Sequence, residues 1–164
     1  MHEYPPELQA AIKQLRDDVA KRAAGDGCNC PVCDRKAKWG RRSLSKKQAK
    51  ALINLYKHTQ PGEFKHNTEF ADNPGDGDEI AKCRYWGLVE TGGTTAKEKI
   101  HTGHWRLTPH GRWFVQGKCT IIKYVWVYQS EAMGWEGPQV SIYDCLKQKF
   151  DIREVLVPGP ATYR

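Results

Sequence analysis

The chain has 164 residues, enough for one hydrophobic core with additional elements but short for two full domains. Its 26 Lys and Arg against 19 Asp and Glu give a formal charge of +7, which favours an acidic partner, with nucleic acid first. A basic protein with no such partner is the alternative. No apolar run approaches the roughly 20 residues of a membrane span, and the start lacks a signal-peptide layout, so we expect a cytoplasmic protein without a membrane partner.

Residues 6–24 are predicted to form a helix that ends at Gly25-Asp26-Gly27. Its apolar residues fall on one face at helical spacing: Leu8, Ala11, Ile12, Leu15 and Val19. This helix could dimerise the protein or cover the core. The narrow stripe favours covering, and the sequence leaves the oligomeric state open.

Three of the six cysteines lie close together, as Cys28, Cys30 and Cys33. Without a secretory signal, thiols or metal ligands are favoured over disulfides. The segment Cys30–Asp34 has the shape of a knuckle, in which two thiolates hold Zn²⁺ and backbone N–H groups stabilise their charge. The sequence therefore predicts a structural zinc site with these three cysteines as ligands. The alternative is a knuckle-like loop that carries no metal.

A tetrahedral site needs further ligands beyond one knuckle. His101 and His104 are candidates, although solvated histidines or histidines near phosphate are the alternative. The solitary Cys83, Cys119 and Cys145 lie in apolar surroundings, which favours buried structural thiols.

Residues 35–50 carry basic side chains and no acid. Ser45 is the expected N-cap of a second helix, whose apolar residues follow at helical spacing: Ala49, Leu52, Ile53 and Tyr56. The basic residues that we expect to contact phosphate here are Arg35, Lys36, Lys38, Arg41, Arg42, Lys46 and Lys47.

Residues 64–70 are predicted to form a short helix, and residues 78–86 a candidate DNA-recognition helix with Lys82 and Arg84 outward. The start of that helix carries three acids, Asp76, Asp78 and Glu79. Acids at this end argue against reading bases in a major groove, because phosphate repels them.

The helix is expected to end at Gly87, and a strand to begin at Leu88. Residues 92–103 form the expected loop, in which Lys97 and Lys99 could meet phosphate, although a solvated hairpin explains them as well. On the returning strand Trp105 and Leu107 alternate, and the next helix starts after the cap residue Thr108 with Pro109 at its first position.

Residues 119–157 are expected to form a β-hairpin and a short helix. The first strand is residues 120–129, the turn is 133–137, the second strand is 138–143, and Asp144 caps the helix 145–150. Three aromatic residues could stack on bases or contact a protein, although packing is favoured: Tyr124, Trp126 and Trp135.

The order of Trp86-Gly87-Leu88-Val89, a basic loop and Leu107-Thr108-Pro109-His110-Gly111 resembles winged-helix regulators of the multiple-antibiotic-resistance type. That resemblance implies a recognition helix, a wing and DNA binding. Further motifs run along residues 28–157: Cys30-Pro31-Val32-Cys33-Asp34, Arg41-Arg42-x-Leu44, Gly103-x-Trp105-Arg106-Leu107, Lys123-Tyr124-Val125 and Ile142-x-Asp144-x-Leu146. With them the chain resembles small phage-borne and prophage-borne proteins in which a zinc knuckle joins a winged-helix core. Cys28 departs from the two-cysteine knuckle.

The expected fold is α+β, a winged helix-turn-helix core with additions. We expect these regions in chain order: an N-terminal helix (1–27), the cysteine knuckle and basic segment (28–42), the winged-helix core (43–118), the hairpin and helix packed on that core (119–157) and a tail (158–164).

No phosphate-binding glycine loop, zinc-protease motif or serine-hydrolase motif is present in the sequence, and we expect no enzymatic activity. Two functions remain. The first is a phage-type DNA-binding winged-helix protein with structural zinc, with transcription regulation as one role. The second is a phage-encoded interaction module or inhibitor that binds an acidic host protein, such as a polymerase or a defence nuclease, in the host cytoplasm. Winged helices serve both uses.

Overall fold

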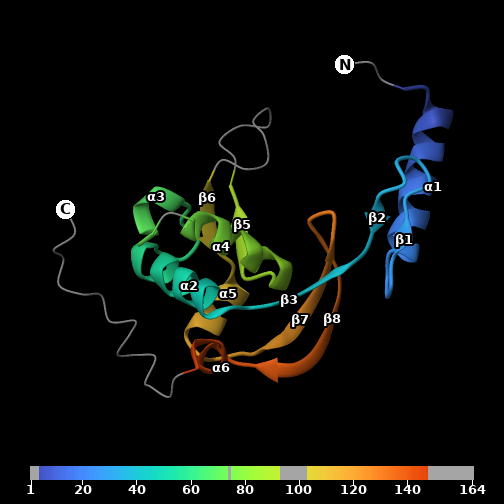
Figure 1. Ribbon diagram of the computed structural model, residues 1–164. Coiled ribbons are helices and arrows are strands. Elements are labelled where there is room, and N and C mark those ends of the chain that lie inside the picture. Colours follow the sequence, from blue (N-terminus) through green and yellow to red (C-terminus); the bar gives the residue numbers. More distant parts are fainter. Residues whose placement is uncertain (1–3, 74, 93–102, 148–164) are drawn as a thin grey trace. The chain divides into compact units, whose positions relative to one another are not determined.

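The computed structural model describes residues 4–73, 75–92 and 103–147 and shows a mixed α+β fold with small sheets (Figure 1). The chain divides into two compact units. The first unit contains Met1–Arg42 and Trp126–Gly134, and the second contains Ser43–Val125 and Trp135–Arg164. Within the described ranges, every helix is too short or too polar to cross a bilayer.

The first unit begins with helix α1 (Pro6–Arg22), which confirms the predicted N-terminal helix. Strands β1 (Cys28–Asn29) and β2 (Lys36–Ala37) pair antiparallel after it, with Cys28 opposite Ala37. The small core of this unit is Val19, Ala23 and Ala37, with Cys28, Trp39 and Tyr128 packed against it. Trp39 fixes the chain on the helix, because its indole N–H donates to the Ala20 carbonyl at 2.9 Å.

Helix α2 (Lys46–His58) is the central helix of the second unit and contacts α4, α5 and α6. Ser45 caps it as predicted. The Ser45 side chain accepts from the Gln48 N–H, and the Gln48 side chain accepts from the Ser45 N–H. The predicted apolar face is buried at Ala49, Leu52 and Ile53.

The prediction of one helix over residues 64–70 was wrong in its first half. Strand β4 (Lys65–His66) comes first, and helix α3 (Asn67–Phe70) is a single turn. Strand β4 pairs with β6 (His104–Leu107), which places Lys65 opposite Trp105. Backbone pairing to a segment about 40 residues away therefore outweighs local propensity.

The predicted recognition helix starts two residues earlier than expected and changes type before its end. Helix α4 covers Asp76–Lys82, and a 3-10 turn, η1, covers Cys83–Trp86. Gly87 ends it at φ +67°, as the sequence predicted. Strand β5 (Val89–Thr91) follows and pairs with β6, so the sheet order is β4-β6-β5.

Trp105 and Leu107 are both buried on β6, which confirms the predicted alternation. The predicted loop residues Lys97, Lys99 and His101 lie outside the described residues. Helix α5 (Pro109–Val115) begins as predicted, with Pro109 at its first position and the Thr108 side chain accepting from the Gly111 N–H.

The C-terminal hairpin differs from the prediction at its turn. Strand β7 (Ile121–Tyr128) and strand β8 (Glu131–Val140) meet at Gln129 and Ser130, both with positive φ. The predicted turn at 133–137 was wrong, because its glycines lie within β8. Two non-glycine residues in left-handed conformation make the actual turn, a choice that turn statistics do not favour. With β3 (Gly40–Ser43), the sheet order is β3-β7-β8.

Helix α6 (Ile142–Leu146) begins three residues before the predicted start. Ser141 is the N-cap, and Asp144 is its capping-box partner, so the prediction of Asp144 as the cap was wrong. The Ser141 backbone N–H donates to Asp144 and, with the Ser141 hydroxyl, holds the pKa of this carboxyl below its usual value. Ser141 was missed because either polar residue can cap.

Candidate nucleic-acid interface

The basic segment of the first unit presents its charges outward. Ala37 is buried and Trp39 half-buried against α1, while the residues between and around them are exposed. This alternation follows from extended chain, in which neighbouring side chains point to opposite faces. The exposed basic residues of the segment are Arg35, Lys36, Lys38, Arg41 and Arg42.

Arg41 has an aromatic neighbour on the hairpin tip. Its guanidinium lies 6.0 Å from the centroid of the Trp126 ring, at the outer limit of a cation–π contact. Trp126 is half-buried on β7, which agrees with the packing alternative for this residue. One side of the Arg41 guanidinium therefore faces the ring of Trp126.

Four further predicted phosphate contacts lie in the second unit. Lys46 and Lys47 are exposed on the first turn of α2. Lys82 and Arg84 are half-buried on α4 and η1. The Lys82 ammonium binds Glu79 at 2.9 Å, and the Arg84 guanidinium lies 5.1 Å from the Tyr85 ring centroid. Lys82 is thus paired with a carboxylate of its own unit, whereas Lys46 and Lys47 extend into solvent.

The acids that argue against DNA binding have structural partners. The carboxylate of Asp76 accepts from the N–H groups of Asp72 and Asn73, both at 3.0 Å. Lys82 holds the pKa of Glu79 below its usual value through a hydrogen bond, with smaller contributions from Gln48 and Lys47. Asp78 is exposed. Of the three acids, Glu79 is therefore the one that is paired with a cation among the described residues.

Cys30 and Cys33 form a two-cysteine knuckle. The Asp34 N–H donates to the Cys30 carbonyl at 2.8 Å, and Asp34 itself has a φ of +57°. The backbone N–H groups of Val32 and Cys33 donate to the Cys30 sulfur and, with the Cys33 thiol, hold the pKa of Cys30 below its usual value. This cradle suits a thiolate, and the thiolate is the form in which cysteine binds zinc.

Cys28 faces a different neighbour, since its sulfur lies 4.0 Å from the Val19 carbonyl oxygen of α1. Within the described ranges, no three His, Cys, Asp or Glu side chains gather into a possible metal site. His104 is instead in edge contact with His66, at 5.0 Å between ring centroids. The knuckle by itself thus supplies two of the four ligands of a tetrahedral zinc site.

The solitary cysteines follow the packing prediction in part. Cys83 and Cys145 are buried, and burial raises the pKa of both thiols, that of Cys145 to about 11. Cys119 is half-buried, and burial raises its pKa too.

These environments predict an order of alkylation in the metal-free protein. Because the thiolate is the reactive form, a lowered pKa leaves Cys30 more reactive near neutral pH than Cys119. We expect iodoacetamide to modify Cys30 before Cys119, and Cys83 and Cys145 only after denaturation, as measured by peptide mass spectrometry. Denatured protein, in which all six thiols should react at similar rates, is the control. Equal rates for Cys30 and Cys119 in the folded protein would contradict the cradle.

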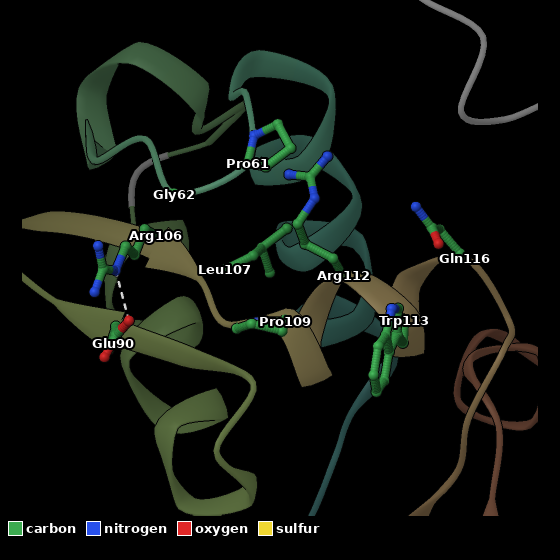
Figure 2. A pocket seen from close by; sticks show the side chains of 9 residues that line it. All are labelled: Pro61, Gly62, Glu90, Arg106, Leu107, Pro109, Arg112, Trp113 and Gln116. Atoms are coloured by element: carbon green, nitrogen blue, oxygen red, sulfur yellow. Dashed lines mark hydrogen bonds and ion pairs between the residues drawn. The ribbon is translucent and has the colours of Figure 1, made fainter.

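A pocket of about 410 Å³ in the second unit brings together residues that the sequence analysis did not select (Figure 2). Two arginines, Arg106 and Arg112, line it together with Glu90 and the exposed Trp113. In the sequence, the only hint of this pocket was the pair Arg112-Trp113 on a predicted helix. Such a pair does not indicate a pocket until the positions of the neighbouring strands are known.

The exposed aromatic residue Trp135 has a structural contact, because its indole N–H donates to the Tyr85 carbonyl at 3.1 Å. No family model matches the chain, and no curated protein or solved structure is significantly similar to it.

Proposed function

We propose that the protein binds DNA, with the second unit acting as a winged helix and the exposed basic residues contacting phosphate. The observation that carries this proposal is the order of elements from α2 through β4, α3, α4 and β5 to β6, with a sheet ordered β4-β6-β5. This is the order of elements that a winged helix requires, with α3 and α4 as its helix-turn-helix pair; most of the residues expected to form its wing, 92–103, lie outside the described ranges.

The charges of the described residues support the same proposal. The segment from Arg35 to Arg42 presents five exposed cations, and Lys46 and Lys47 extend from the first turn of α2. Phosphate contacts by Lys and Arg supply most of the affinity of non-specific DNA binding. On α4, Glu79 is paired with Lys82, so this acid and this base offset each other in the balance of charge. Sequence-specific regulation would require base contacts from exposed residues of α4 or the wing.

A structural zinc ion is the second part of the proposal. Cys30 and Cys33 supply two thiolates in a hydrogen-bonded cradle, and the remaining ligands would come from outside the described cluster. In the alkylation experiment, added Zn²⁺ should protect Cys30 and Cys33 and leave the rate at Cys119 unchanged. Equal reactivity with and without the metal would exclude zinc at the knuckle.

The DNA proposal predicts a measurable salt dependence. Fluorescence anisotropy on a random-sequence duplex should show binding that weakens steeply as salt rises, because phosphate contacts release counterions. Replacing Arg41 and Arg42 with alanine should reduce the slope of log K against log salt by roughly two units and weaken binding at low salt by at least about tenfold.

A variant with the same loss of charge serves as the control. Lys13 and Lys21 are exposed on α1 and lie outside the proposed contacts, so K13A/K21A should leave the slope near that of the native protein. An unchanged slope in R41A/R42A would remove these arginines from the interface. Absence of duplex binding in both the native protein and the control would reject DNA as the partner.

An apolar groove in the first unit favours binding of an acidic host protein as a second candidate function. Ile12, Leu15 and Val19 of α1 line it with Val32 of the knuckle, which is 75% exposed, and Arg16 lies at its edge. An acidic amphipathic segment matches this combination of apolar and basic residues. Val32→Asp should then abolish capture of an acidic partner and leave duplex binding intact. Capture of the acidic partner that survives Val32→Asp would remove this groove from the second candidate function and leave DNA as the proposed partner.

A further inference from the structure

The pocket between β6 and α5 has two sides of different charge (Figure 2). On one side, the Arg106 guanidinium binds Glu90 and lies 4.5 Å from the Phe64 ring centroid. This arginine is therefore paired with a carboxylate. On the other side stands Arg112, which extends from α5 toward Pro61. Among the described residues, Arg106 is paired with a carboxylate and Arg112 is not, so Arg112 is the lining arginine that a ligand could use.

Arg112 is held in position by an aromatic ring rather than by an acid. Its guanidinium lies 4.4 Å from the Tyr56 ring centroid, and the Tyr56 hydroxyl accepts from the Gln116 amide at 2.9 Å. No carboxylate pairs with Arg112 in the part of the chain that the structure describes. A guanidinium that packs its face on a ring keeps its edge N–H groups for two oxygens of an anion such as phosphate or carboxylate.

Trp113 adds a second recognition element to the same pocket, and its ring points away from the Arg112 guanidinium (Figure 2). Its side chain is 56% exposed, and Pro61, Leu107 and Pro109 supply apolar walls nearby. A free phosphate ion would bind Arg112 but would gain nothing from contact with the indole ring of Trp113. A ligand that uses both carries an anion and a flat aromatic body within one small molecule, and a volume of about 410 Å³ is in the range of small-molecule sites.

We propose that this pocket binds a nucleoside phosphate, with the phosphate on Arg112 and the base against Trp113. Paired bases are stacked inside a duplex, so the ligand would be a free nucleotide or an unpaired nucleotide of a single strand. The pocket thereby adds a second binding activity to the duplex binding proposed above, and its residues are separate from the basic residues assigned there. Failure of one proposal leaves the other standing.

The experiment measures binding of the full chain to a labelled oligothymidine by fluorescence anisotropy, with thymidine 5′-monophosphate as competitor. Trp113→Ala should weaken binding by roughly tenfold, the size expected for one stacked base, while Trp113→Phe should retain most of the affinity. Arg112→Gln should weaken it comparably. Lys118→Gln removes an exposed charge just after α5 and should have little effect.

Competition by the mononucleotide would assign the pocket to free nucleotides, and binding of the oligonucleotide alone would assign it to single strands. Both outcomes support the proposal when Trp113→Ala weakens binding. The proposal is overturned when the native protein binds neither probe, or when Trp113→Ala and Arg112→Gln both bind as the native protein does. Since Trp113 is exposed, its alanine variant tests the pocket even where Arg112→Gln disturbs Tyr56. Duplex affinity should be unchanged in Trp113→Ala.

Discussion

Replacing Gly111 with alanine is expected to destabilise the second unit by roughly 3 kcal/mol or more. A Cβ at this position would overlap the Leu88 carbonyl oxygen. This oxygen belongs to the backbone, so it cannot move aside as the end of a flexible side chain can. Leu88 also accepts the Thr108 N–H at 3.1 Å, so a shift of this carbonyl would disturb the start of α5. From helix propensity alone, the same change would stabilise the protein by up to about 1 kcal/mol.

Urea denaturation monitored by circular dichroism measures this effect. Gly134→Ala is the matched control, because no atom lies within 4 Å of its added Cβ and its φ is not positive. We expect the free energy of unfolding of the control to lie within about 0.5 kcal/mol of that of the native protein. A Gly111→Ala variant as stable as the control would mean that β5 and α5 do not pack as closely as described.

Truncation of Phe114 to alanine is expected to cost about 3–5 kcal/mol, the usual range for a buried phenylalanine. Phe114 is fully buried on α5, and removal of its ring would leave a cavity in the core of the second unit. A loss of this size is a large fraction of the stability of a small protein, so the variant could unfold at room temperature. Phe114→Leu, which removes less volume, should keep the protein folded with a smaller loss.

The neighbouring residue provides the control for this prediction. Trp113 is of similar size and lies on the same helix, but it is exposed, so Trp113→Ala should change the free energy of unfolding by less than about 0.5 kcal/mol. The two variants are compared by the same denaturation. Equal losses at both positions would contradict the orientation of α5.

Local sequence signals predicted most of the helices because their causes are local. Ser45 and Thr108 cap α2 and α5 as expected, and Gly87 ends η1 in the left-handed conformation. A cap hydrogen bond joins residues three positions apart, so it can be recognised from the sequence. The cradle of Cys30 and Cys33 was predictable for the same reason.

Long-range pairing decided what the local signals missed. Strand β4 exists because Lys65 and His66 pair with β6, and the hairpin turn lies at Gln129 and Ser130, between the neighbouring strands β7 and β8. Neither residue pair carries a strong turn or strand signal. The pocket could not be predicted either, since Tyr56, Arg106 and Trp113 come from three separate elements.

The sequence by itself determined the basic charge, the α+β class, the knuckle and the caps of α2 and α5, because composition and short-range hydrogen bonds depend on residues close together in the chain. Only the tertiary structure decided which charges are available to a ligand. Lys82 and Arg106 are bound by carboxylates, whereas the Arg112 guanidinium lies against the Tyr56 ring and lines a pocket. The physical reason is that an ion pair or a stacked ring depends on which elements meet in space, and packing of the core sets those meetings.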